Sequence, residues 1–147
     1  MEQLQSVDVI DVPVAQTWSS LSADPRAVLV DVRTRAEWAF VGLPDLSEIG
    51  KPVVTVEWQT FPDSRIDAQF SERLGAALQS SGVNKDDEIF FICRSGGRSR
   101  MAAEAMTAAG YKRCRNVAEG FEGPLDDSRH RGQTAGWKAS GLAWVQG

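Results

Sequence analysis

Short apolar runs alternate along the chain with segments that have helical periodicity. Runs with β character occur at residues 7–10, 27–30, 52–56, 88–92 and 114–117. The run at residues 27–30 is continuously apolar, which is typical of a strand that is covered on both faces of a sheet. The pattern therefore predicts five strands, and the run at residues 88–92 carries the strongest β signal.

The segments between these strands carry helix signals. Two apolar stripes have helical spacing, Val14–Trp18–Leu21 and Phe70–Leu74–Leu78. Thr34 and Glu37 have the spacing of a capping box, which predicts a short helix through Phe40. An Ala-rich helix is expected to end at Ala109, before Gly110. Because strands alternate with helices, we expect an α/β fold: a doubly wound, mainly parallel five-stranded sheet with helices on both faces.

The length and composition fit one folded domain over residues 1–147, in which residues 126–147 form a polar tail rich in turn formers. The longest apolar run, residues 89–93, is far shorter than the roughly 18 residues that span a bilayer. The first residues lack the basic and apolar regions of a secretory signal. We therefore expect a cytoplasmic protein that does not contact a membrane. With one His and two Cys in the chain, we expect no metal site and no cofactor.

Positive charge gathers in one segment, although the net charge of the chain is −4. Residues 93–115 contain six basic residues and one acidic residue, so this segment carries +5 and the rest carries −9. A solvated helix surface is the ordinary interpretation of such a run. Nucleic acid is not expected as a partner, because the acidic remainder would repel phosphates. A small-anion site is the second interpretation, because Arg94 directly follows Cys93 and Arg98 directly follows a glycine pair. Composition alone leaves both interpretations open.

The segment from Cys93 to Ser99 is the candidate site. A thiol follows a buried strand, a glycine pair lets the backbone curl, and a helix begins directly behind it. The helix N-terminus and the two arginines favour a thiolate. We therefore expect Cys93 to be the catalytic nucleophile, with the rest of the loop binding the substrate through Arg94, Ser95, Gly96, Gly97, Arg98 and Ser99. A purely structural cysteine is the alternative, and Cys114, which lacks a glycine loop, keeps that interpretation.

Four segments occur in an order that is specific when they are taken together: Leu29-Val30-Asp31-Val32-Arg33 with Glu37-Trp38, the Cys93–Ser99 loop, Ala109-Gly110-Tyr111, and Asn116-Val117-Ala118-Glu119-Gly120-Phe121. From about Val9 to about Trp144 the chain resembles the rhodanese family of single-domain sulfurtransferases. The resemblance implies a thiosulfate sulfurtransferase in which Cys93 takes up sulfane sulfur as a persulfide. The persulfide then passes this sulfur to cyanide or to a thiol.

The chain departs from that family at two places. Gly42 is followed by Leu43-Pro44 where the family usually has Gly-His, and the polar tail is longer than a minimal domain needs. Arg33 and Glu37 lie four residues apart, which predicts a structural ion pair. His130, the only histidine, lies in the polar tail and is expected to be exposed; a Cys–His pair requires the tail to fold back.

Two other functions stay open at this stage. Cys-dependent phosphatases and arsenate reductases use Cys-x5-Arg loops, whereas Cys93 and Arg98 are separated by four residues, which makes a tighter cradle. A non-catalytic sulfur carrier or protein-binding module is the second alternative, although such modules often lack the cysteine. For the enzyme, the expected partners are a small anionic sulfur donor and a cyanide or thiol acceptor. A protein persulfide or a sulfur-carrier protein is equally compatible with the sequence.

Overall fold

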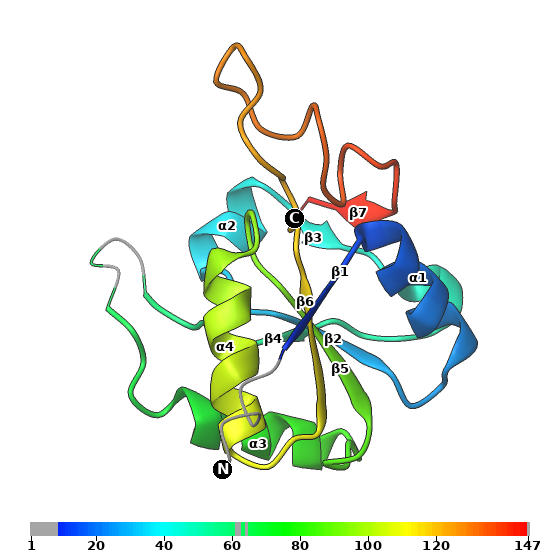
Figure 1. Ribbon diagram of the computed structural model, residues 1–147, viewed down its shortest axis with the longest axis vertical. Coiled ribbons are helices and arrows are strands. Elements are labelled where there is room, and N and C mark those ends of the chain that lie inside the picture. The colour runs from blue at the N-terminus through cyan, green and yellow to red at the C-terminus, as the bar shows by residue number, and fades with distance from the viewer. Residues whose placement is uncertain (1–8, 61–62, 64, 147) are drawn as a thin grey trace.

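Strands and helices alternate along the chain in the computed structural model, which describes residues 9–60, 63 and 65–146 (Figure 1). In chain order the elements are β1 Ile10–Val12, α1 Val14–Ala23, β2 Val28–Asp31, α2 Arg35–Phe40, β3 Leu43–Pro44, the 3-10 helix η2 Ser47–Ile49, β4 Val54–Thr55, α3 Phe70–Ser80, β5 Glu88–Ile92, α4 Gly97–Ala108, β6 Arg113–Val117 and β7 Trp144–Val145.

The main sheet has five strands in the order β1-β6-β5-β2-β4, and all of its pairs are parallel. The predicted fold class is therefore confirmed. Strand β5 is central and pairs with β2 on one side and β6 on the other. Ligands of such sheets bind beyond the carboxyl ends of the strands. Because Cys93 directly follows β5, the fold places it at that edge, in the middle of the sheet.

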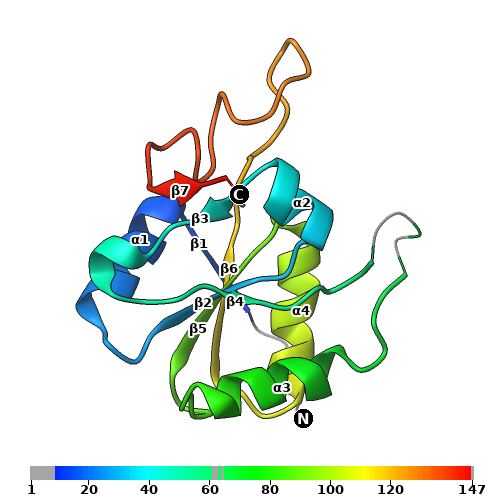
Figure 2. The same cartoon turned by 180° about the vertical axis from the view of Figure 1, so that it is seen from behind.

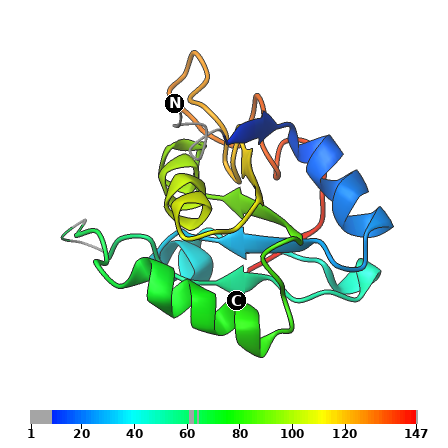
Figure 3. The same ribbon diagram turned by 60° about the horizontal axis from the view of Figure 1, so that its bottom comes forward.

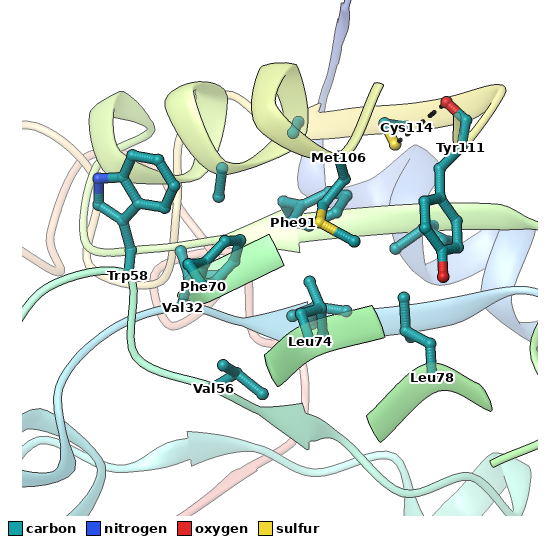
Figure 4. Packing of buried hydrophobic residues seen from close by; sticks show 14 of the residues in the cluster. Val32, Val56, Trp58, Phe70, Leu74, Leu78, Phe91, Met106, Tyr111 and Cys114 are labelled. Carbon is teal, nitrogen blue, oxygen red and sulfur yellow. Dashed lines mark hydrogen bonds between the residues drawn. The ribbon is translucent and has the colours of Figure 1, made fainter. Parts of the chain in front are cut away.

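Helices cover both faces of the sheet, as Figure 3 shows. One face packs under α3 and α4, where the stripe Phe70–Leu74–Leu78 meets Phe91 and Met106 in the cluster shown in Figure 4. The other face packs under α1 and η2. The stripe of α3 is buried because its apolar residues fall on one side of the helix. Both cores leave the carboxyl edge of the sheet free to carry polar groups.

Three local features differ from the predicted pattern. Strand β1 covers Ile10–Val12 instead of residues 7–10, of which Val7 and Asp8 lie outside the described residues. Strand β4 is only Val54–Thr55, shorter than the predicted residues 52–56. Strands β3 and β7 form a second, antiparallel pair that the sequence did not predict (Figure 2).

The end of the chain packs on the rest of the protein. Trp137 is fully buried and meets Trp18 edge to face, with ring centroids 5.9 Å apart. Gly42 has φ +118°, and a Cβ there would lie 2.7 Å from the Trp144 ring. A glycine is therefore required at this turn. Leu43 and Pro44, the residues after Gly42 that depart from the usual Gly-His pattern, form strand β3.

Candidate active site

Cys93 lies at the end of the central strand and is almost completely buried, with 1% of its surface exposed. Its carbonyl oxygen accepts a hydrogen bond of 2.8 Å from the backbone N–H of Phe121. The strand β5 before it is buried because every residue from Ile89 to Ile92 is apolar and covered by helices. The rigid sheet therefore fixes the position of the Cys93 thiol.

The loop after Cys93 curls under the thiol at Gly96. The Gly96 N–H donates a hydrogen bond of 3.2 Å to Cys93 Sγ, and helix α4 begins one residue later. Gly96 has φ +106°, and a Cβ there would lie 2.2 Å from the carbonyl oxygen of Ala118. Only glycine fits both conditions. The helix N-terminus and this N–H place partial positive charge beside the sulfur.

A buried polar chain leads away from the sulfur on its inner side. The Asn116 amide nitrogen donates to Asp11 Oδ1 (2.9 Å) and to the Gly96 carbonyl (3.2 Å), so its oxygen faces Ser99. The Ser99 hydroxyl donates to this oxygen at 2.6 Å and lies 3.2 Å from Cys93 Sγ. Because the hydroxyl has one proton, Asn116 Oδ1 and Cys93 Sγ compete for it as acceptors.

Sequence reasoning missed the roles of Asn116 and Asp11. Asn116 belongs to the segment 116–121 that resembles the rhodanese family, and it is also a polar residue within an expected strand. A polar side chain at such a position was the signal that it needs a hydrogen-bond partner. Hydrogen bonding from Asn116 outweighs burial, and together with Arg100 it lowers the pKa of Asp11. Asp11 therefore stays a carboxylate that fixes the orientation of the Asn116 amide.

The predicted ion pair between Arg33 and Glu37 is wrong. The helical i,i+4 rule does not apply, because Arg33 precedes the N-cap Thr34 and lies outside helix α2. Arg33 instead pairs with Asp31 at 2.6 Å, and both side chains are fully buried. The Arg33 guanidinium also donates to the Gly42 carbonyl and stacks on the Phe121 ring.

Glu37 instead holds the last arginine of the cysteine loop. Its two oxygens accept hydrogen bonds of 2.8 and 2.9 Å from the two terminal nitrogens of Arg98. Glu37 also completes the predicted capping box with Thr34. Burial alone would raise the pKa of Glu37, but hydrogen bonds from Arg98 and Thr34 outweigh it and lower the pKa to about 2. This fork ties the N-terminal end of α4 to α2.

The other loop residues face outward. Arg94, Ser95 and Gly97 are exposed, whereas Ser99 is buried. Arg94 and Arg98 line a cleft of about 680 Å³, together with residues of α2 and of the chain after β6. The structure thus brings the loop residues around Cys93, but it divides them between the interior and the cleft wall.

Cys114 and His130 lie apart from this arrangement. Cys114 is a buried free thiol on β6 that contacts the Tyr111 carbonyl (Figure 4), and burial raises its pKa. His130 is exposed, and its backbone N–H and carbonyl both bond to Asp126. In the part of the chain that the structure describes, no hydrogen bond joins the His130 ring to Cys93.

Neither a metal-binding cluster nor a membrane-spanning helix is present among the described residues. No group of three or more His, Cys, Asp or Glu side chains there could hold a metal ion. No helix among the same residues is long and apolar enough to cross a membrane.

Comparisons with known proteins cover nearly the whole chain. The family described as the STR4 middle domain matches residues 11–147. The crystal structure of Rv0390 from M. tuberculosis is 48% identical, with a TM-score of 0.80 over 93% of this chain and 97% of that one. Thiosulfate sulfurtransferase 18 of Arabidopsis thaliana is 33% identical over 122 residues, which is 82% of each chain.

A third relative and a further structure agree with these matches. The protein RC0915 of Rickettsia conorii is 37% identical over 129 residues, or 88% of this chain and 91% of that one. A rhodanese-like domain protein from Staphylococcus aureus, 18% identical, has a TM-score of 0.56 over 95% of this chain and 99% of its own. The last likeness concerns the fold alone, and it fits the parallel sheet described above.

Proposed function

Since the chain belongs to the STR4 middle-domain family and has a rhodanese-like fold, we propose that it is a sulfurtransferase that uses Cys93 as its nucleophile. The observation that carries the proposal is the environment of the Cys93 sulfur. It ends the central strand, receives the Gly96 N–H at 3.2 Å and lies 3.2 Å from the Ser99 hydroxyl. The name of the relative thiosulfate sulfurtransferase 18 supports the same reaction class.

The proposed reaction has two displacement steps. In the first, the Cys93 thiolate attacks the outer sulfur of thiosulfate, an S–S bond forms at Sγ, and sulfite leaves with the electrons of the bond that breaks. In the second, cyanide or a thiolate attacks the sulfur held on Cys93. The bond to Sγ breaks, and Cys93 leaves as a thiolate. No external oxidant or reductant is needed, since the transferred sulfur enters and leaves in the same oxidation state.

The loop residues divide the work in this proposal. The Gly96 N–H and the N-terminus of α4 stabilise negative charge on the sulfur. Arg94 is exposed at the cleft, where its guanidinium binds the sulfonate oxygens of the donor. Arg98 is held by Glu37, so its main role is to fix the shape of the loop.

Two observations weigh against phosphate chemistry at this thiol. A Cys-x5-Arg phosphatase needs a free arginine to hold the phosphoryl oxygens, but both terminal nitrogens of Arg98 are engaged by Glu37. Cys93 is also 1% exposed, which suits the approach of a single sulfur atom better than that of a tetrahedral phosphoryl group.

The test compares two cysteine variants in the transfer of sulfur from thiosulfate to cyanide. Cys93→Ser is expected to lose the activity by at least roughly a thousandfold, because serine is a far weaker nucleophile. Cys114→Ser serves as the matched control: it changes a buried thiol that lies outside the loop, and most of the turnover should remain. Equal losses in both variants would contradict the single-thiol mechanism. A wild type that turns over neither thiosulfate nor another sulfane donor would favour a non-catalytic module.

A further inference from the structure

The cleft beside the cysteine loop is much larger than thiosulfate or cyanide requires. Its volume of about 680 Å³ lies within the usual range for small-molecule sites. Its lining includes Phe40 of helix α2 and the two cap residues of that helix, Thr34 and Val41, together with Arg94 and Arg131. A substrate that fills this space has several times the size of a single oxyanion.

Two arginines of the cleft have no acidic partner among the described residues. The lining contains three arginines, Arg94, Arg98 and Arg131, and two acids, Glu37 and Glu122. Glu37 already forms an ion pair with Arg98. No carboxylate pairs with Arg94 or Arg131 within residues 9–60, 63 and 65–146. With Glu122 as the remaining acid, the unpaired side chains of the lining carry a net charge of +1, which favours an anionic ligand.

Backbone contacts hold Arg131 in the cleft wall. The loop at residues 124–136 extends beyond the carboxyl ends of the strands, at the end of the sheet where α2 lies (Figures 1 and 2). Gly123 closes its base: its N–H donates to the Arg94 carbonyl at 3.1 Å, and its own carbonyl accepts from Arg131 Nη1 at 2.8 Å. A Cβ on Gly123 would lie 2.0 Å from the Ala135 carbonyl oxygen, so the loop returns tightly onto this residue.

Other lining residues offer apolar contact. Phe40 is 78% exposed although it is large and hydrophobic, and it lines the cleft together with Val41. Gln146 donates to the Phe40 carbonyl at 2.8 Å, which holds this end of α2 against the end of the chain. A ligand that carries both an anionic group and an aliphatic part would suit both the basic and the apolar lining residues.

We propose that this cleft binds an acceptor thiol of peptide size that carries a carboxylate, and that Arg131 binds that carboxylate. The inference rests on the proposed function, because the acceptor has to meet sulfur held on Cys93. The acceptor thiolate attacks the outer sulfur of the protonated Cys93 persulfide. The bond to Sγ breaks, Cys93 leaves as a thiolate, and the acceptor carries away a persulfide with its proton.

The experiment compares three acceptors with thiosulfate as the donor, and sulfite release as the readout. The acceptors are reduced glutathione, which is a tripeptide thiol with two carboxylates, then uncharged 2-mercaptoethanol, and cyanide. In Arg131→Ala, the ratio of kcat/KM for glutathione to that for cyanide is expected to fall at least about tenfold, since a charge-assisted bond is lost. The ratio for 2-mercaptoethanol to cyanide should change less than twofold. Arg131→Lys should recover only part of the loss, because an ammonium cannot form the fork.

A neighbouring arginine provides the matched control. Arg129 lies in the same loop, is exposed and has φ +63°, a conformation that asparagine tolerates. Arg129→Asn should leave both ratios within twofold of the wild type. An unchanged glutathione ratio in Arg131→Ala, or an equal fall for 2-mercaptoethanol, would overturn the inference.

A binding measurement separates this inference from the proposed function. S-methylglutathione has no free thiol, so calorimetry with this probe measures binding to the cleft without sulfur transfer. We expect Arg131→Ala to weaken its binding at least about tenfold relative to the wild type. If the wild type binds this probe but transfers no sulfur, the proposed function fails and the cleft assignment stands. If the wild type transfers sulfur to cyanide but does not bind the probe, the cleft assignment fails alone.

Discussion

Replacing Glu37 with Gln removes the charge that joins α2 to the cysteine loop while it keeps the shape of the side chain. Gln can still accept a hydrogen bond from the Thr34 N–H, so the capping box is largely preserved. The fork to Arg98 loses its second accepting oxygen and its negative charge. The variant therefore isolates the ionic part of the contact between Glu37 and Arg98.

The size of the effect follows from the pKa of Glu37. The folded protein lowers this pKa from 4.5 to about 2, even though burial acts in the opposite direction. A lowered carboxyl pKa contributes stability that is fully present above pH 4.5 and is lost as the pH falls toward 2. The shift corresponds to about 3 kcal/mol at pH 7, and to about 1 kcal/mol at pH 3. The side chain is 19% exposed, so solvent screening makes these values upper limits.

Urea denaturation of the wild type and of Glu37→Gln at pH 7 and at pH 3 measures this difference. We expect the variant to lose about 2–3 kcal/mol of unfolding free energy at pH 7 and about 1 kcal/mol or less at pH 3. Glu48→Gln is the control, since Glu48 is exposed in η2, and it should change stability by less than about 0.5 kcal/mol. The same loss for Glu37→Gln at both pH values would refute the argument, because the stabilisation would then not come from the carboxylate charge.

Two further predictions concern the groups that surround the sulfur. Gly96→Ala should abolish sulfur transfer while the protein stays folded by circular dichroism, because its Cβ would lie 2.2 Å from the Ala118 carbonyl oxygen. Gly82→Ala, at a glycine that also has a positive φ (+77°) but nothing within 4 Å of its Cβ position, should stay active, and similar activities of the two variants would contradict the steric explanation. Ser99→Ala leaves the Asn116 oxygen without its donor, so the unfolding free energy should fall by about 1–3 kcal/mol and persulfide formation should slow. Ser81→Ala, at an exposed serine, should change neither the unfolding free energy nor the rate of persulfide formation. If Ser99→Ala also changed neither quantity, the polar chain would have no role at the site.

Local signals made much of the fold predictable. The capping box of Thr34 and Glu37, the apolar stripe of α3 and the bounds of β5 all depend on residues close together in the sequence, and all three are confirmed. The pairing of β3 with β7 could not be predicted, because two-residue strands about a hundred residues apart carry no periodicity. The buried Trp137 likewise gave no signal inside a polar, turn-rich segment.

The site was predictable as a loop but not as a set of contacts. Cys93, the glycines and the start of α4 follow from their order in the sequence. The partners of Glu37 and Arg33 do not, because the fold brings α4 against α2 and turns Arg33 back to Asp31. The position of Arg131 in the cleft depends on the return of the 124–136 loop onto Gly123, a contact that no spacing rule describes.

The most direct test of the central claim is the intact mass of the protein after incubation with thiosulfate. The wild type and Cys114→Ser are each expected to gain the mass of one sulfur atom, and cyanide should remove it. Cys93→Ser should gain nothing under the same conditions. A sulfur adduct that persists in Cys93→Ser, or that disappears in Cys114→Ser, would contradict the assignment of Cys93 as the residue that carries the sulfur.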